Sequence, residues 1–339
     1  MNNNSDYRIA YLDHNVLDLM TKGDPHRVKE LLSGTDLLPV YSTENLAEIH
    51  RSKGREADFL RLLDEINAQH LVLELDSGFK YTGKAFLKKI PSEQAFEEYI
   101  ENINEVPGDF GLSDLLLKFY GGNEEKTFND IFEMQKGELA NYLHSVFDDI
   151  NEDELNHEEK EAINTIKSYI DELPDILANL NNTSLNQLDK LESSALKSFE
   201  DETGICPKVL NNISGTNIIL QIWDMLVSNP EFNHTDLDTF FGIKPHQFEQ
   251  DSKHVRTQVE KVNGIYHQLN FLGYYRDSNM RKERRFKASF SDMTHAGIAS
   301  LCHFFLCRDD RLVKKASAAY EYLSIPTQII HYSNSKKCD

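Results

Sequence analysis

The chain has 339 residues, of which 40% are hydrophobic, and it carries a formal net charge of −20. This length suits one large domain with an insertion or two ordinary domains. No run of about 18 apolar residues is present, and the polar start MNNNSDYRIAYLD lacks the basic and apolar regions of a secretory signal. We therefore expect a soluble, cytoplasmic protein with no membrane partner.

The first part of the chain, residues 7–80, has the pattern of an α/β domain. The segments YRIAYLD (7–13) and DLLPVYS (36–42) predict short apolar strands. The segments TENLAEIHR (43–51) and EADFLRLLDEINAQH (56–70) predict amphipathic helices, because their apolar residues recur every three or four positions.

The middle of the chain, residues 85–280, is mainly helical in pattern and rich in Glu, Asn and Leu. Residues 91–205 contain 28 Asp and Glu but only seven Lys and Arg, whereas the rest of the chain contains 28 acids and 29 bases. The negative charge therefore belongs to the middle of the chain, and it does not exclude a nucleic-acid partner for the two ends.

The last part, residues 288–331, again has an α/β pattern. SFSDMTHAGIASLC (289–302) predicts a helix that begins at Ser291 or Asp292 as its N-cap. The segment that follows, residues 304–330, reads as a strand, a polar turn, a helix and a second strand.

Neither end of the chain has enough strands for a sheet of its own. We therefore expect one α/β domain, with a parallel sheet flanked by helices, that is split by a large and mainly α-helical insertion. The expected boundaries are 1–82 for the N-terminal part, 83–285 for the acidic insertion and 286–339 for the C-terminal part.

The four cysteines form no C-x-x-C pair, so neither a zinc site nor a disulfide framework is expected. We interpret Cys206, Cys302, Cys307 and Cys338 as buried or idle thiols.

Acidic residues follow several of the predicted strands. Asp13 comes directly after the first strand, and Asp309 comes after the strand at 304–307. Glu44 and Glu48 are four residues apart, which places both on one face of the helix after the second strand. Loops at the carboxyl ends of parallel strands meet in one crevice. We therefore expect these acids to converge at one edge of the sheet.

Four segments together resemble the acidic blocks of PIN-domain nucleases: YLDHNVL, STENLAEIHR, SDMTHAGIA and FLCRDDRLVKKA. LSIPTQII is similar to the closing strand of that family, whereas the middle of the chain has no counterpart in a small PIN domain. The resemblance implies a PIN-like sheet. It also implies that Asp13, Glu48, Asp292 and Asp309 are both the catalytic residues and the metal ligands.

Two alternatives stay open within this resemblance. Glu44 competes with Glu48, and Asp310 competes with Asp309, because Cys307 and Asp310 depart from the residues that the family commonly has at these positions. His295, one helical turn past Asp292, either orients a phosphate or a water or has a packing role.

The resemblance implies a metal-dependent endoribonuclease that hydrolyses phosphodiester bonds, as a toxin or an effector of antiviral defence. A cluster of carboxylates repels itself unless a cation is bound, and all-oxygen ligation selects Mg²⁺ or Mn²⁺. Such an ion activates water and neutralises charge on the phosphate. Single-stranded or structured RNA is the expected substrate, and DNA is left open.

The sequence RKERRFK contains five basic residues in seven positions, just before the last α/β segment. Arg281, Lys282, Arg284, Arg285 and Lys287 are candidates for binding the phosphate backbone of a nucleic acid. The alternative interpretation is a solvated surface.

A second hypothesis is a non-catalytic, PIN-like scaffold or regulatory protein whose acidic helical insertion binds a protein partner. The insertion is also a candidate surface for homo-oligomer formation. The two hypotheses differ in whether the four acids meet at a common point.

Overall fold

The computed structural model describes residues 7–78, 80–105, 112–148, 150, 155–190, 194–232, 234–245 and 255–333. Internal contacts divide the chain into two compact units. The first unit, here called the sheet domain, comprises Met1–Asn102, Ile205–Asp277 and Lys287–Asp339. The second, the helical unit, comprises Ile103–Gly204 and Ser278–Phe286. Because both ends of the chain and a long central segment form the sheet domain, the helical unit is inserted within it.

The sheet domain is built on one six-stranded sheet with the order β4-β3-β2-β1-β5-β6. All neighbouring strands are parallel except β3 and β4. From β1 the chain first adds strands on one side and then, with β5, on the other, so the strand order reverses between β1 and β5. The strands are β1 (Arg8–Leu12), β2 (Leu37–Ser42), β3 (Gln69–Leu75), β4 (Tyr81–Lys88), β5 (Phe304–Cys307) and β6 (Gln328–His331).

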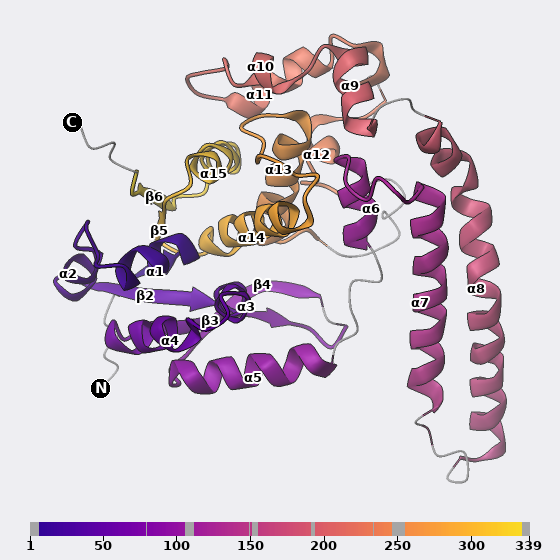
Figure 1. Ribbon diagram of the computed structural model, residues 1–339, viewed down its shortest axis with the longest axis horizontal. Helices are drawn as coiled ribbons and strands as arrows, with labels where there is room; N and C mark the ends of the chain where they lie inside the picture. Colours follow the sequence, from indigo (N-terminus) through magenta and orange to yellow (C-terminus); the bar gives the residue numbers. More distant parts are fainter. Residues whose placement is uncertain are drawn as a thin grey trace. The chain divides into compact units, whose positions relative to one another are not determined.

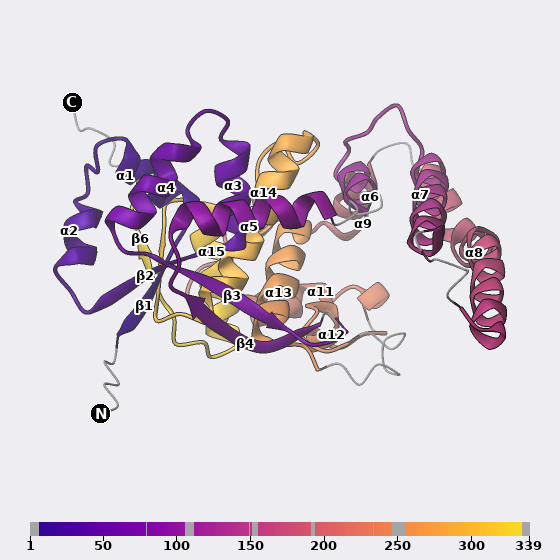
Figure 2. The same cartoon turned by 90° about the horizontal axis from the view of Figure 1, so that it is seen from below.

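One face of the sheet packs on helices from the first third of the chain. These are α1 (His14–Thr21), α3 (Thr43–Arg51), α4 (Glu56–Glu65) and α5 (Ser92–Glu105), whereas α2 (Val28–Ser33) precedes β2. Ala10 and Leu12 of β1 are fully buried in the core cluster with Leu46, Ile49 and Leu63. Figure 2 shows α1, α4 and α5 on one side of the strands. The apolar periodicity of these helices thus supplies the core on this face.

The other face of the sheet is covered by α13 (Gln258–Leu272), α14 (Glu283–Ala299) and α15 (Asp310–Tyr322). Successive side chains of a strand point to opposite faces, so Tyr11 points away from the Ala10 and Leu12 cluster. Its ring packs against His295 of α14 and Phe305 of β5. The hydroxyl of Tyr320 on α15 donates to the carbonyl of Ala296, which joins α14 to α15. Shorter elements also belong to this domain: α10 (Pro207–Leu210), α11 (Ile218–Leu226), η2 (Pro230–Phe232) and α12 (Leu237–Phe240).

The helical unit contains α6 (Leu112–Phe119), α7 (Phe128–Asp148), α8 (His157–Asp189) and α9 (Ala195–Thr203). Figure 1 shows α7 and α8 side by side as a long helical pair. The carboxylate of Asp189 at the end of α8 accepts hydrogen bonds from the backbone N–H groups of Phe128 and Asn129. It therefore supplies partners to the otherwise unpaired donors at the start of α7.

Three expected boundaries need correction. The expected insertion, 83–285, started inside β4, and it included residues 83–102 and 205–277, which are part of the sheet domain. The helix expected at 56–70 ends at Glu65, because Asn67 adopts a left-handed backbone conformation with φ of 52°. The helix expected to begin at Ser291 or Asp292 begins at Glu283, because the residues of the basic run are good helix formers.

Three of the four cysteines lie in the described part of the chain. Cys206, Cys302 and Cys307 are free thiols, and the last two are buried, as expected. Cys338 lies outside the described part of the chain. Among the helices that the structure describes, none is both long and apolar enough to cross a membrane.

Candidate functional site

Two of the predicted acids lie at the point where the strand order reverses. Asp13 directly follows β1, and Asp309 follows β5 after one residue. The two strands are neighbours, with Leu12 in register with Leu306, and the N–H of Asp13 donates to the carbonyl of Leu306. In open α/β sheets ligands bind outside the carboxyl ends of the strands at such a reversal. The fold therefore places both acids where a binding crevice is expected.

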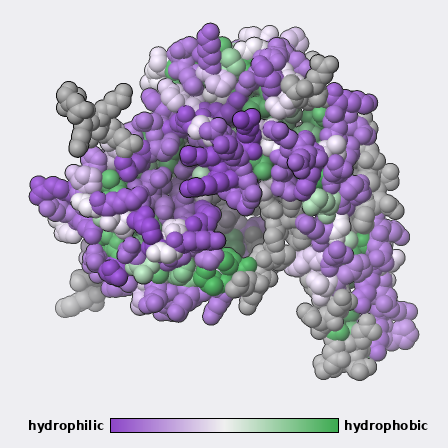
Figure 3. Space-filling model, viewed as in Figure 1, coloured by the Kyte–Doolittle hydropathy of each residue, from purple (hydrophilic) through white to green (hydrophobic). Residues whose placement is uncertain are grey.

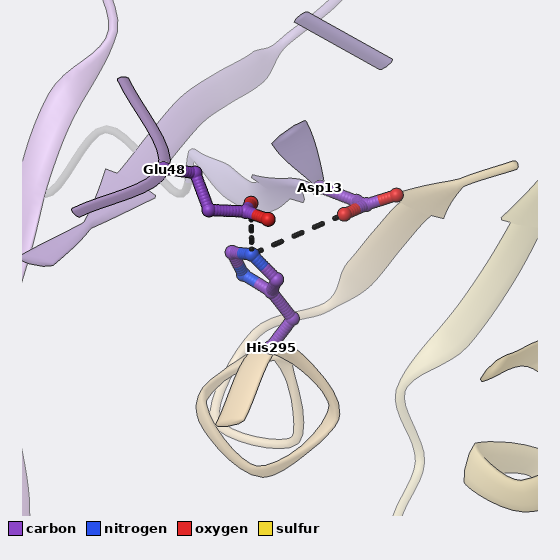
Figure 4. A group of neighbouring side chains, drawn as sticks. All are labelled: Asp13, Glu48 and His295. Carbon is purple, nitrogen blue, oxygen red and sulfur yellow. Dashed lines mark hydrogen bonds and ion pairs between the residues drawn. The ribbon is translucent and has the colours of Figure 1, made fainter. Parts of the chain in front are cut away.

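Asp13, Glu48 and His295 form a compact group of side chains (Figure 4). One ligand atom from each lies within 4.8 Å of the others. Asp13 is 1% exposed, and neither of its carboxylate oxygens makes a hydrogen bond of good geometry within the described residues, although Asn15 lies close enough to lower its pKa. A buried charged group without partners is energetically costly. The carboxylate oxygens of Asp13 therefore have lone pairs that are available to bind a cation.

His295 is held rigidly between the two acids and the sheet. Its Nε2 lies 2.9 Å from Glu48 Oε2 and 4.0 Å from Asp13 Oδ1. Its Nδ1 lies 2.7 Å from the hydroxyl of Tyr11, which in turn lies 2.6 Å from Ser42 Oγ. Both ring nitrogens are thus engaged, and the orientation of the imidazole is fixed by Tyr11 of β1 and Glu48 of α3.

The charges within the group shift its titration. Burial raises the pKa of Asp13 to about 6, although the positive charge of His295 opposes the shift. Burial would lower the pKa of His295, but its hydrogen bond to Glu48 and the charges of Glu48 and Asp13 raise it to about 9. Burial would raise the pKa of Glu48, and His295 holds it below its ordinary value instead. At neutral pH, Glu48 and the buried His295 therefore form an ion pair.

Asp292 and Asp309 do not belong to the close group of Asp13, Glu48 and His295. Asp292 lies one helical turn before His295 on α14, and burial followed by the charges of Asp277, Asp13 and Asp309 raises its pKa well above the ordinary value. Asp309 is the N-cap of α15, and its Oδ1 accepts hydrogen bonds from the backbone N–H groups of Arg311 and Leu312 at 2.8 and 3.0 Å. Asp309 therefore has a structural role besides its place at the edge.

The structure also separates the neighbouring candidates. Glu44 Oε1 accepts hydrogen bonds from Ser291 Oγ at 2.6 Å and from Arg51 at 3.1 Å, so Glu44 contacts α14 beside the Asp13 group. Asp310 is exposed and pairs with His331 at 3.3 Å. Between the competing acids, Glu48 therefore belongs to the group with Asp13. Asp310, the competitor of Asp309, faces solvent.

The basic candidates are all surface residues. Exposed side chains are found at Arg281, Lys282, Arg284, Arg285 and Lys287. The first four belong to the helical unit and Lys287 belongs to the sheet domain. Their exposure fits a contact with phosphate and also fits a solvated surface.

Two residues near the site were missed by the sequence analysis. His14 is largely buried, its Nδ1 has no hydrogen-bond partner among the described residues, and it lies 4.0 Å from Glu48 Oε2. Burial lowers its pKa, so the ring is neutral and its free nitrogen is a further potential metal ligand. Its position directly after Asp13 was the only sequence signal.

Lys315 is the second missed residue. It is fully buried, and its Nζ lies 2.7 Å from Asp277 Oδ2 and 3.0 Å from Asn270 Oδ1. Lys315 lies three residues after Leu312 and one before Ala316, both buried, so helical spacing placed it on the inner face of α15. That spacing was a readable signal for a buried lysine.

No family model, no curated protein and no solved structure matches this chain. The structure confirms the α/β class, with a mostly parallel sheet flanked by helices. The resemblance to PIN-domain nucleases stays a prediction that rests on the motifs.

Proposed function

We propose that this protein is a metal-dependent endoribonuclease whose site lies at the reversal of the strand order. The observation that carries the proposal is Asp13, a buried carboxylate next to Glu48 whose oxygens make no hydrogen bond of good geometry within the described residues. Without a ligand, His295 and Asn15 compensate the desolvation of this side chain only in part, because its pKa is still raised to about 6. A divalent cation is the simplest ligand that removes this cost.

The residues around Asp13 fit a hard divalent cation. Asp13 and Glu48 would hold the ion, with Asp292, Asp309 and the neutral His14 as further ligands. Carboxylate oxygens favour Mg²⁺ or Mn²⁺, and a bound ion would supply Lewis acidity and an activated water for attack on a phosphodiester. Protonated His295 offers no lone pair to the metal. Its positive charge instead keeps Glu48 ionised and oriented through the 2.9 Å contact.

RNA is the proposed substrate, and the roles as a toxin or as an antiviral effector belong to the same proposal. The exposed basic side chains of residues 281–287 are suited to phosphate contacts, which supply most of the sequence-independent affinity for nucleic acids. If DNA is cleaved and RNA is not, the substrate class changes, but the proposed metal-dependent hydrolysis of phosphodiester bonds stays.

Two observations favour the second candidate function, a non-catalytic scaffold that binds a protein through its acidic helices. Asp309 caps α15, and the Glu48–His295 ion pair is complete without any ion. If these contacts are purely structural, the carboxylates stabilise the fold and bind no metal.

The test is hydrolysis of labelled total RNA, transfer RNA and single-stranded DNA by purified protein in Mn²⁺ and in EDTA. We expect cleavage of RNA in Mn²⁺ and none in EDTA. Asp13→Asn should reduce the rate at least about 100-fold, because even changes to groups that support metal ligands cost about 10–100-fold. Asp310→Asn is the matched control, since Asp310 is exposed at the same edge, and it should stay near the parent rate. Cleavage that persists in EDTA, or in Asp13→Asn, would refute the proposal.

A further inference from the structure

An apolar cavity of about 400 Å³ lies in the sheet domain beside the Asp13 group. Leu71 and Leu73 of β3 line it, and because they are two residues apart, both point to the same face of the strand. Tyr81 of β4 and Tyr99 of α5 also line it. Its volume lies within the range of about 300–1,000 Å³ that is typical of small-ligand pockets.

The cavity is open to solvent through its aromatic and apolar side. Tyr81 is 42% exposed, and Leu75, its partner across the β3–β4 pair, is 47% exposed. Figure 3 shows a group of hydrophobic residues by the β3–β4 part of the sheet, within a mainly hydrophilic surface. Contiguous apolar patches that are exposed to solvent often mark the binding sites of proteins.

The other side of the cavity is polar and is shared with the acidic site. Glu44 lines the cavity from α3, one helical turn before Glu48, and Thr294 lines it from α14 immediately before His295. The carboxylate of Glu44 is held in place by Ser291 and Arg51. The two helices that position the Asp13 group therefore also form the polar wall of the cavity.

We propose that this cavity binds an unpaired nucleobase of the RNA substrate, from a nucleotide beside the phosphate that is cleaved. The inference rests on the proposed function for the choice of RNA. A base is a flat ring that stacks on aromatic and apolar side chains, and its polar edge needs hydrogen-bond partners. The cavity offers apolar walls, two tyrosines and a fixed carboxylate in this arrangement.

Glu44 gives the cavity a preference among the bases. An ionised carboxylate only accepts hydrogen bonds, so it favours a base with an exocyclic amino group. Cytosine, adenine and guanine carry such a group, whereas the base of uridine donates only through its ring N3–H, which lies between two carbonyl oxygens that repel a carboxylate. We therefore assign Glu44 to base selection, distinct from the metal-binding role of Glu48.

The test measures binding without hydrolysis. Fluorescence anisotropy of labelled oligocytidylate and oligouridylate in EDTA should show that the wild type binds the cytosine oligomer at least about fivefold more tightly. Glu44→Gln should bring the two affinities within about twofold, because an amide both donates and accepts hydrogen bonds. Tyr81→Ala should weaken binding of both oligomers about tenfold, since one stacked base is worth about that factor.

Phe86→Ala is the matched control. Phe86 lies on the same strand as Tyr81, is 45% exposed and does not line the cavity, so this change should leave both affinities unaltered. The inference is overturned if the wild type binds the two oligomers equally or binds neither of them. It is also overturned if Tyr81→Ala and Phe86→Ala have equal effects. These outcomes count whether or not RNA is cleaved in Mn²⁺. Selective binding that depends on Glu44, without any hydrolysis in Mn²⁺, would support the cavity and refute the nuclease function.

Discussion

His295 is the residue on which the electrostatics of the acidic site depend. It is fully buried, yet it carries a positive charge because Glu48 and Asp13 surround its Nε2. In the absence of an ion this charge partly offsets the repulsion among the carboxylates. A divalent cation held by Asp13 and Glu48 would therefore lower the pKa of His295.

The raised pKa of His295 predicts how stability depends on pH. Its folded value of about 9 exceeds its ordinary value of 6.5, so its stabilising contribution is complete below pH 6.5 and is lost as the pH rises towards 9. Asp13 also has a raised pKa, but its effect is confined to the range between 3.8 and about 6. In EDTA, the wild type should lose a few kcal/mol of unfolding free energy between pH 6.5 and 9.

His295→Gln should reduce this loss, because the amide does not titrate, although removal of the positive charge raises the pKa of Asp13 further. Urea unfolding at the two pH values measures the effect in both proteins. Parallel losses in the wild type and in His295→Gln would show that another group is responsible.

Lys315 and Asp277 form the second buried pair of the sheet domain. Removing one partner of such a pair leaves an unpaired buried charge and costs about 3–5 kcal/mol. Lys315→Met should therefore destabilise the protein by about this amount. Combining it with Asp277→Asn should restore part of the loss, because the second charge is then gone. If urea unfolding shows that the two changes simply add, the pair is not coupled.

At the scale of elements, Asp309 has two separable roles, as the cap of α15 and as a proposed ligand. Asparagine also caps helices, whereas alanine does not and costs about 1 kcal/mol. In EDTA, Asp309→Asn should be as stable as the wild type or more so, because it removes one repelling charge, and Asp309→Ala should be less stable. Both should lose nuclease activity if Asp309 binds the metal. Full activity in Asp309→Asn would restrict this residue to capping.

The strands and helices that bear the acids could be predicted from local patterns. The strands β1, β2, β5 and β6 are short apolar runs, and α3 and α15 have helical spacing, so Asp13 and Asp309 were placed correctly after their strands and Glu48 was placed correctly on α3. β4 was missed because YTGKAFLK is mainly exposed and polar, and its place in the sheet depends on pairing with β3. The bonds from His295 to Tyr11 and from Glu44 to Ser291 join residues more than 200 positions apart, and periodicity carries no signal for such contacts.

At the scale of the whole molecule, charge is segregated along the chain. The acidic residues concentrate in 91–205, most of which belongs to the helical unit, and the basic run follows at 281–287. A basic cluster that contacts phosphates makes affinity depend on salt, because each contact releases about one counterion.

Replacing the basic cluster should therefore change the salt dependence of RNA binding. The variant with Ala at Arg281, Lys282, Arg284 and Arg285 should bind RNA more weakly at low salt, with a slope of log affinity against log salt that is smaller by up to about four. Anisotropy titrations from 50 to 200 mM salt, about the range in which such contacts lose most affinity, measure the slope. An unchanged slope would assign the run to solvated surface.

The central claim is that the carboxylates at the strand reversal bind a divalent cation. The most direct measurement is the unfolding free energy of the wild type and of Asp13→Asn, with and without Mn²⁺. A ligand that binds only the folded state adds about 2.7 kcal/mol at a hundredfold excess over its dissociation constant. We expect the wild type to gain stability of this order, and Asp13→Asn to equal or exceed the wild type in EDTA but to gain little from Mn²⁺. A wild type whose stability is indifferent to millimolar Mn²⁺, or an equal gain in Asp13→Asn, would contradict the claim.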